Sequence, residues 1–460
     1  MIHFNLISTF RRGCVCAAVF FVFQSAWAEP LQVATFEIDA TPPIGGALCN
    51  GLVQPAKVIV TPLTGRGLIL AGAGQPIVLC AFDWVAIANE THDVMRAALA
   101  KAVNTSIDRV TVHTLHQHDA PGTDFATERI LAEHGLGGKY SNPEFDRDVV
   151  ARLEASARAA MKKLRPVTHV GLGTGLVEKV ASNRRVLGPN GRVVIQRNSA
   201  SKSPGAKTAP EGTIDPLLRL ISFWDGATPI AVCTYYATHP QSYYGKGGVS
   251  WDFVGMARAL REKALPGVPH IHFNGAGGNV AAGKYNDGAP EMRAELATRL
   301  ADGMGRAWDA QNKSPVSAEA VKWKATAATL PLREELKEKS LEAKLRDPKL
   351  AQGVRIRAGR DLAYARRVNA GQKITMTCLQ LGEAHVVHMP GELFVEYQLA
   401  AQKMKPQSFV AMAAYGDSGP GYIGTEIAYS QGGYETGIVS RTAPTVERVL
   451  MAAMKQLLVP

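Results

Sequence analysis

Two histidines separated by one residue are the first residues of this chain whose type and spacing could do chemistry. His116 and His118 follow a β-branched run that opens at Val110, and they precede the turn-like residues 119–122. In extended backbone both imidazoles would point to the same face, and neutral imidazole is the commonest protein ligand for a metal. Two polar residues near a turn are the alternative interpretation of such a short motif.

Three further segments place ligand-type residues after apolar runs. His239 follows an apolar run and precedes Pro240; its alternative interpretation is a hydrogen-bonded histidine at a strand end. Glu392, in a Pro-Gly-Glu segment, could instead be a carboxylate favoured by the dipole of a first helical turn. Tyr422 and Tyr434 lie in a glycine-rich loop of the kind that normally connects elements at the surface.

Taken together and in this order, these segments resemble the catalytic domain of the neutral (non-lysosomal) ceramidases, which are secreted zinc amidases. The resemblance runs from about Ile38 to Glu435. It implies a mixed α/β fold in which a central mixed β-sheet core is flanked by helices. It also implies site residues: the zinc ligands His116, His239, Glu392 and Tyr422, a substrate-contacting Tyr434, and an Asn-Arg pair at Asn183 and Arg184.

The function implied is that of an exported zinc-dependent amidohydrolase, in which zinc-activated water cleaves an amide (N-acyl) bond. His118, beside the metal, would move a proton or stabilise the oxyanion, and Arg184 would hold a substrate oxygen. An ester, a lactone or a sugar derivative is the alternative substrate for the same fold. A binding protein without turnover is the alternative from another functional class.

Three departures from the family pattern bear on the substrate. Leu115 replaces the family's threonine, the C-terminal immunoglobulin-like domain has no counterpart, and Gly275 stands in the place of the family's serine. Without that serine, water is expected to attack directly. We also expect Gly275, Gly277, Gly278 and residues 283–288 to line a polar mouth, which predicts smaller or more polar substrates than long-chain ceramide.

Two other motifs have a possible link to the site. Asp252 is a candidate partner for orienting His239, and a carboxylate at a helix N-terminus is the equally plausible alternative. His270 and His272 form a second His-x-His, but it has no match in the family pattern and is expected to be structural.

These residues need strands and helices to position them. Strands are predicted at 31–38, 66–71, 76–82, 110–115, 214–224, 229–236, 270–273, 374–380 and 384–389. Helices are predicted from Asn89, as a cap, to Val103, and at 145–164, 253–265, 291–309, 333–347, 392–404 and 442–458. Residues 198–213 are expected to form an exposed loop. We see no repeat and no linker, and therefore predict one α/β domain over 29–460.

Composition limits where the protein acts and what it binds. Residues 1–28 have the charged start, apolar core and small-residue cleavage site of a signal peptide, which predicts a periplasmic or secreted protein. The apolar run is too short for a transmembrane segment. A net charge of +11 is compatible with peripheral contact with an anionic membrane surface. Basic stretches interleaved with aromatics are missing, so nucleic acid is not an expected partner.

The remaining expectations concern surface charge and thiols. The Lys/Arg-rich stretch 333–367 also contains acids and is expected to form solvated helix faces. Four cysteines follow the signal segment, with no metal-site spacing: Cys49, Cys80, Cys233 and Cys378. Buried thiols are the favoured interpretation and a disulfide stays open. The expected partner is a small-molecule or lipid substrate, and the oligomeric state stays open.

Overall fold

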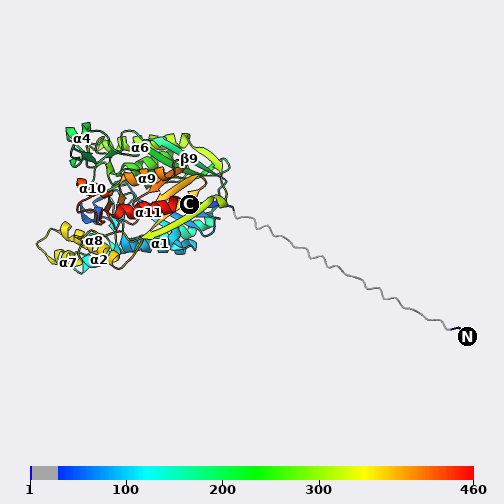
Figure 1. Ribbon diagram of the computed structural model, residues 1–460, viewed down its shortest axis with the longest axis horizontal. Helices are drawn as coiled ribbons and strands as arrows, with labels where there is room; N and C mark the ends of the chain where they lie inside the picture. The colour runs from blue at the N-terminus through cyan, green and yellow to red at the C-terminus, as the bar shows by residue number, and fades with distance from the viewer. Residues whose placement is uncertain (3–29, 460) are drawn as a thin grey trace.

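The computed structural model describes residues 1–2 and 30–459 (Figure 1). The predicted signal peptide therefore lies, apart from its first two residues, outside the described part of the chain. The larger strands form three sheets that share one order of connection. In each sheet three successive strands run antiparallel, a helix crosses over, and a fourth strand returns parallel to the third.

The first sheet contains β6, β4, β3 and β1 in that order, with the short strand β8 (Arg165–Pro166) at its edge. Parallel neighbours such as β4 and β6 need a crossover connection, which α1 (Asn89–Val103) supplies. The β-branched and apolar residues of these strands are almost all buried, which explains why runs of such residues predicted the strands from the sequence. The strand bounds are β1 Gln32–Asp39, β3 Thr64–Ala71, β4 Ile77–Phe82 and β6 Val110–Thr114.

The second and third sheets repeat this arrangement. Helix α5 (Asp252–Ala264) connects the parallel strands β14 and β16, and α9 (Val395–Met404) connects β21 and β23. The bounds in the second sheet are β9 His169–Leu176, β13 Leu217–Asp225, β14 Thr228–Tyr236 and β16 His270–Asn274. Those in the third are β19 Val321–Ala328, β20 Ile374–Leu381, β21 Ala384–His388 and β23 Phe409–Ala413.

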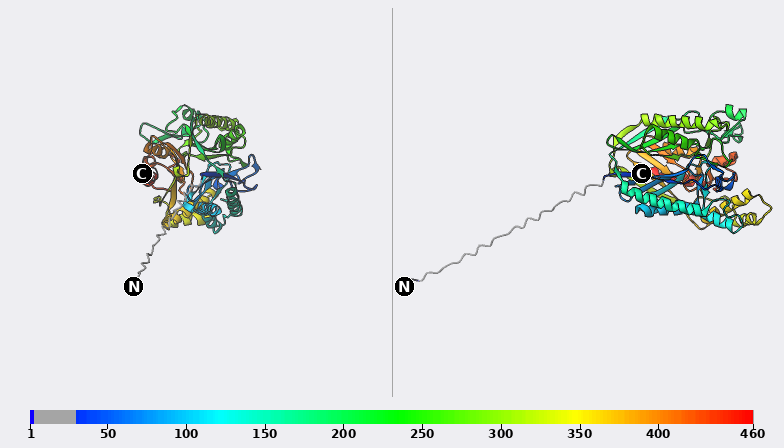
Figure 2. Two further views of the ribbon diagram at one scale, coloured as in Figure 1. Left: turned by 90° about the vertical axis from the view of Figure 1, so that its right-hand side faces the viewer. Right: turned by 180° about the vertical axis from the view of Figure 1, so that it is seen from behind.

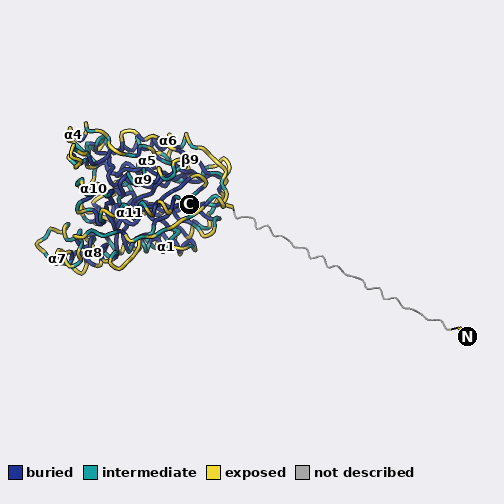
Figure 3. The backbone as a smooth tube through the Cα atoms, in the orientation of Figure 1, coloured by how far each residue is buried: buried dark blue, intermediate teal, exposed yellow. Residues whose placement is uncertain are grey.

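One outer helix completes each of the three units. Helix α3 (Pro143–Ala160) packs on β1 beside α1, α6 (Glu291–Asp309) packs on β9 beside α5, and α11 (Val446–Leu458) packs on β19 and β20. The left view of Figure 2 shows the units around the middle of the molecule, the second in green, the third in orange to red and the first in blue to cyan. The interior is buried, and the exposed residues lie at the periphery, on the outer faces of the helices and on the connecting loops (Figure 3).

The last strands of the three sheets, β6, β16 and β23, meet at their carboxyl ends. The Thr114 amide donates to Tyr415 O at 2.9 Å, and the Ala414 amide donates to Asn274 O at 2.9 Å. The Asn274 side-chain amide closes the set by donating to Leu115 O at 2.8 Å. Loops that leave all three sheets are thereby brought to one place, where their side chains can form a common site.

The shorter elements connect these units and build the end of the molecule where α4, α7, α8 and α10 gather in Figure 1. The helices are α2 Phe125–Ala132, α4 Pro204–Thr208, α7 Glu338–Arg346, α8 Gln352–Asn369 and α10 Glu426–Gln431. The first short strands are β2 Val58–Ile59, β5 Ala86–Ile87, β7 Gly122–Thr123, β8 Arg165–Pro166, β10 Ser182–Asn183 and β11 Arg185–Leu187. The others are β12 Val193–Gln196, β15 Gly248–Val249, β17 Val280–Ala281, β18 Asn312–Pro315, β22 Glu392–Leu393 and β24 Tyr422–Ile423.

Most predicted elements are confirmed within a few residues, and two expectations about them are wrong. Asn89 does not cap α1; it is the first helical residue, and its side chain bonds Asp124 instead. The stretch expected to be loop contains α4. The strands β9, β19 and β23 and the helix α2 were not predicted, and α8 was expected only as part of the solvated helix faces over 333–367. The three units share their topology without visible sequence similarity, which is why no repeat was seen in the sequence.

The four described cysteines are buried free thiols, which confirms the favoured interpretation. None of the described helices is both long and apolar enough to cross a membrane.

The second His-x-His is structural in the described fold. His270 and His272 are buried in β16, and His272 Nδ1 contacts Thr234 Oγ1 at 2.8 Å. Burial lowers the pKa of His272 to about 3 and that of His270 to about 4. Both imidazoles are therefore neutral in the folded protein near pH 7.

The free energy of unfolding should fall as the pH is lowered from about 7 to about 4. The unfolded chain takes up a proton at His272 below about pH 6.5, but the folded chain does so only near pH 3, so acid favours unfolding. Proton uptake at His272 in the unfolded chain should lower the free energy of unfolding by on the order of 3 kcal/mol at pH 4. Denaturant titrations of wild type and His272→Asn test it: the variant should lose less stability on acidification.

His169, which is half-exposed at the start of β9, provides the matched control. At pH 7, His169→Asn should leave the free energy of unfolding close to that of wild type, which controls for the loss of an imidazole as such. Equal pH slopes for His272→Asn and wild type would contradict the assignment.

Candidate metal centre and its pocket

His116 is fixed by the backbone just after β6. Its φ of 65° lies in the left-handed region, which turns the chain away from the strand direction. The His116 amide donates to Trp84 O at 2.8 Å, and His116 Nδ1 donates to Val85 O at 2.7 Å. A carbonyl can only accept, so the proton lies on Nδ1 and the lone pair on Nε2.

His239 is held in the same manner after β14. Its Nδ1 donates to Gly277 O at 2.6 Å, with Val280 O at 3.1 Å, and its own amide also donates to Val280 O. Its Nε2 therefore also carries a free lone pair. Backbone carbonyls, rather than the predicted Asp252, orient this ring.

Asp252 has another function in the described structure. It is the first residue of α5, with a φ of 48°, and its carboxylate accepts from the amides of Ser242 and Phe253. Arg293 Nη2 lies 3.3 Å away. The expectation that Asp252 orients His239 is wrong, and the helix N-terminal alternative describes it better.

Glu392 and Tyr422 reach the site from a pair of short parallel strands. Glu392 begins β22 and lies opposite Tyr422 in β24. The predicted helix at 392–404 therefore starts too early: α9 begins at Val395, and Glu392 is not in its first turn. Strand pairing places a carboxylate and a phenol, 30 positions apart in the sequence, at the same level.

Electron-pair donors converge where these elements meet. Glu392 Oε2 lies 3.0 Å from His116 Nε2 and 3.3 Å from His239 Nε2, and one ligand atom of each residue lies within 4.8 Å of the others. This oxygen is buried and has no hydrogen-bond partner among the described residues. Two lone pairs and a carboxylate facing one another repel unless a cation lies between them, so the donor set fits a divalent metal.

The Tyr422 hydroxyl adjoins this triad. Tyr422 Oη lies 2.9 Å from His239 Nε2 and accepts from Arg184 Nη1 at 3.0 Å. Burial and the neighbouring Glu392 raise the pKa of Tyr422 well above its usual value, so the phenol keeps its proton unless a cation balances it. Tyr422 thus lies where a fourth donor would be needed.

Arg184 is buried between the site and Glu435. Its Nε lies 3.1 Å from Glu435 Oε1, and its guanidinium lies over the rings of Tyr422 and Tyr434. Burial alone would lower the pKa of Arg184, but Tyr422 and Glu435 outweigh burial and raise it. Arg184 is therefore a permanent positive charge directly behind the Tyr422 hydroxyl.

His118 and Tyr415 complete the surroundings of the histidines. His118 Nε2 lies 3.4 Å from His116 Nε2, and its ring meets Tyr244 edge-on at 4.5 Å between centroids. Both histidines thus face the cluster as predicted, although the turn at His116, and not strand alternation, brings this about. The ring of Tyr415 packs 5.0 Å from that of His116.

A pocket of about 210 Å³ opens beside these donors. His116, His118, Glu392 and Tyr422 line it, and Tyr434 stands at its edge with 48% of its surface exposed. Most of the sequence-predicted site residues are therefore gathered around one pocket, with His239 and Arg184 behind its wall. Asn183 instead lines a different cavity and donates to Thr213 O at 2.8 Å. Further lining comes from residues 49–53, from α8 and from residues 421–441.

The predicted glycine-lined mouth is wrong. Gly275, Gly277 and Gly278 do not line the pocket. A Cβ at Gly275 would collide with the Gln398 side chain, and one at Gly278 would collide with the Glu392 backbone. These glycines instead let backbone segments approach closely enough for Gly277 O to hold His239. Residues 283–288 are not part of the lining either.

Sequence reasoning missed the arginines of this pocket. Arg357 and Arg360 on α8 line it, together with Arg441. Arg357 and Arg360 belong to the stretch 333–367, which was expected to form solvated helix faces. For these two residues that expectation is wrong. Their i, i+3 spacing was the one signal that both side chains share a helix face.

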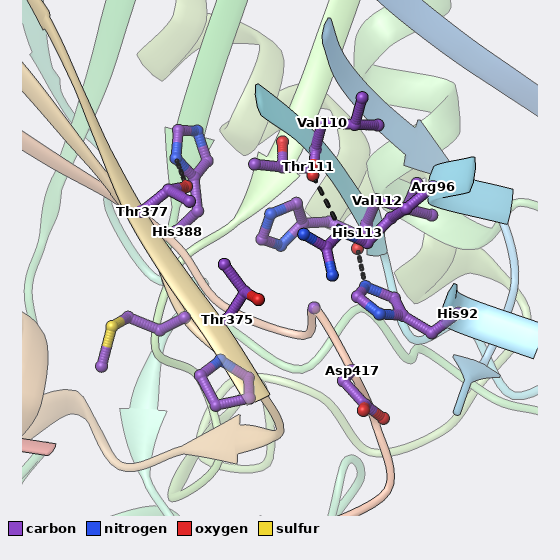
Figure 4. Close-up of a pocket in the computed structure, with 13 residues that line it drawn as sticks. His92, Arg96, Val110, Thr111, Val112, His113, Thr375, Thr377, His388 and Asp417 are labelled. Carbon is purple, nitrogen blue, oxygen red and sulfur yellow. Dashed lines mark hydrogen bonds between the residues drawn. The ribbon is translucent and has the colours of Figure 1, made fainter. Parts of the chain in front are cut away.

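A second, smaller polar cavity lies between β6, α1 and the third sheet (Figure 4). His113 and His388 line it, and the Nε2 atoms of both have no partner among the described residues. Its volume of about 20 Å³ suits one buried water molecule. No set of three metal-ligand atoms converges there within the described chain, so it is not a competing metal centre.

Comparisons with known proteins identify the fold. No protein-family model and no curated protein matches the sequence. The structure is similar to that of neutral ceramidase from Pseudomonas aeruginosa, with a TM-score of 0.70 and 16% identity over 94% of this chain and 74% of that chain. A ceramidase complexed with C2 gives a TM-score of 0.68 and 15% identity over 94% and 75% of the two chains. The predicted resemblance and mixed α/β fold are confirmed; identities this low show the fold alone.

Proposed function

We propose that this chain is an exported, zinc-dependent hydrolase that cleaves the amide bond of an N-acyl compound. The observation that supports this most is the buried Glu392 oxygen between two imidazole lone pairs. The proposed ligands are His116, His239, Glu392 and Tyr422, a nitrogen and oxygen set that suits zinc. The two similar structures are ceramidases, which supports an N-acyl substrate over other carbonyl compounds.

The protein's own groups prepare this chemistry. Bound zinc supplies a Lewis acid that polarises a carbonyl oxygen and lowers the pKa of water. The carbonyls of Val85 and Gly277 keep the protons of His116 and His239 on Nδ1, so that both Nε2 atoms stay available. Arg184 holds the Tyr422 hydroxyl in place and favours its ionised form, which is the better ligand.

Three residues are proposed to act on the substrate. His118 lines the pocket beside His116 and is proposed to move a proton at its imidazole nitrogen. Tyr434, at the pocket edge, is proposed to contact the substrate. Arg184 is proposed to stabilise negative charge that develops on the substrate oxygen, by its charge beside Tyr422.

No covalent acyl-enzyme should form during turnover. Serine and threonine do not occur among the residues that line the pocket, and burial raises the pKa of the lining thiol Cys49 to about 12, which keeps it protonated and unreactive. Water is then the nucleophile that fits best. Mass spectrometry of enzyme quenched during turnover should show the unmodified mass; a trapped acyl adduct would contradict direct attack.

The function is tested with purified protein and a panel of short N-acyl amines, matched O-acyl esters and lactones. We expect hydrolysis of at least one N-acyl amine, loss of activity after chelation, and recovery on adding zinc. Preference for the esters or lactones would keep the zinc hydrolase and replace the amide specificity. Zinc binding without hydrolysis of any compound would contradict the enzymatic proposal.

A further inference from the structure

Two arginines of α8 line the pocket without a charged or hydrogen-bonded partner among the described residues. Arg357 and Arg360 are three residues apart and both line the cavity. Among the described residues, neither guanidinium has a hydrogen bond or an ion pair. The other arginines of the helix do: Arg355 donates to Leu345 O and His134 O, and Arg367 pairs with Asp93.

Arg360 is held in the pocket wall despite being unpaired. Its guanidinium lies 5.8 Å from the centre of the Tyr140 ring. Burial, and then the neighbouring Arg441, lower its pKa, as expected for a cation withdrawn from water without compensation. A half-buried guanidinium that lines a pocket without a counter-charge is poorly compensated, so this arrangement favours a ligand that supplies the missing charge.

The acidic residues nearby cannot supply that charge. Asp361 is bound by Arg441 at 2.7 Å. Glu392, the one acidic residue that lines the pocket, faces His116 and His239. The pocket therefore has a positive excess on the α8 side.

We propose that Arg357 and Arg360 bind an anionic group of the substrate, so that the compound cleaved is an acylated amine carrying a carboxylate or phosphate. This inference rests on the proposed hydrolase function. Guanidinium groups bind oxyanions through paired, charge-assisted hydrogen bonds, which a neutral headgroup does not offer. The apolar rim residues Leu52 and Ile438, 44% and 67% exposed, provide contact for the acyl chain.

Three matched compounds test the substrate class. N-octanoylserine is N-octanoylethanolamine with an added carboxylate, and O-phospho-N-octanoylethanolamine carries a phosphate instead. We expect kcat/KM to be at least tenfold higher for one of the anionic compounds than for N-octanoylethanolamine. The double variant Arg357→Gln/Arg360→Gln should lower it about a hundredfold for that anion, with little change for the neutral amide.

Arg366→Gln is the control, because Arg366 lies on the same helix and pairs with Glu342 at the surface. It should retain the anion preference. The double variant should keep the thermal midpoint of wild type, because it removes cations that have no ion pair. The single variant Arg357→Gln, at a half-exposed position, gives a second measurement of the preference for the anionic compound. A preference that persists in the double variant, or no preference in wild type, would overturn the proposal.

Calorimetry separates this inference from the hydrolase function. The ether 3-(octyloxy)propanoate has no acyl bond to cleave, and 3-(octyloxy)propan-1-ol is its neutral match. Wild-type protein loaded with zinc should bind the carboxylate at least tenfold more tightly, and the double variant should not. If no compound is hydrolysed but this difference appears, the hydrolase function fails and the anion site stands; equal binding by wild type overturns the anion site.

Discussion

His239→Ala should reduce the zinc content of the purified protein from one ion per chain to close to none. His239 Nε2 lies at the centre of the donor set, 3.3 Å from Glu392 Oε2 and 2.9 Å from Tyr422 Oη. Its removal deletes one of two nitrogen donors and releases the contact that holds Tyr422. Hydrolytic activity should fall at least about 10³-fold, because the metal supplies the activation of water. Elemental analysis and kcat/KM measured on the same preparations provide the check.

His169→Ala removes an imidazole far from the donor set and should keep both zinc and activity. Glu392→Gln gives a finer comparison, since it keeps the shape of the side chain and removes the charge that the cation would balance. It should weaken zinc binding without altering the fold, as judged by circular dichroism. Full zinc content in both His239→Ala and Glu392→Gln would show that the metal, if any, binds elsewhere.

Arg258→Met should destabilise the protein by about 3–5 kcal/mol. Asp83 follows β4, and its carboxylate accepts from two Arg258 nitrogens at 2.9 and 2.8 Å. The side chains are 0% and 3% exposed, so the variant leaves a carboxylate buried without its counter-ion. Arg258 lies on α5, so this ion pair joins the first unit to the second. Chemical denaturation at pH 7 measures the loss.

The double variant Asp83→Asn/Arg258→Met should recover part of the lost stability, because it removes the uncompensated charge along with the pair. It also tests a link to the site, since Asp83 directly precedes the segment whose Val85 carbonyl orients His116. A loss below about 1 kcal/mol in Arg258→Met would mean that water or another cation compensates Asp83.

His116 and His239 could be placed at strand ends from the sequence because strand periodicity is a local property. Val110 to Thr114 alternates as a strand must, so the residues that follow it were expected at a strand end. The same reasoning placed His239 after β14. Glu392 and Tyr422 were added as donors only through the resemblance to the neutral ceramidases, and imidazole, carboxylate and phenol donors suit a metal such as zinc.

Other features of the site follow only from the tertiary structure, because they depend on contacts between segments that are distant in the sequence. Pairing of β22 with β24, and not helical position, places Glu392 opposite Tyr422. Packing of Gln398 against Gly275 removes the expected serine position from the pocket, and packing of α8 brings Arg357 and Arg360 into it. Charge patterns along a helix are the same whether a face meets water or a pocket, so the local sequence cannot distinguish the two cases. Donor types are thus encoded locally, whereas the pocket wall, and with it the substrate, depends on how three units pack together.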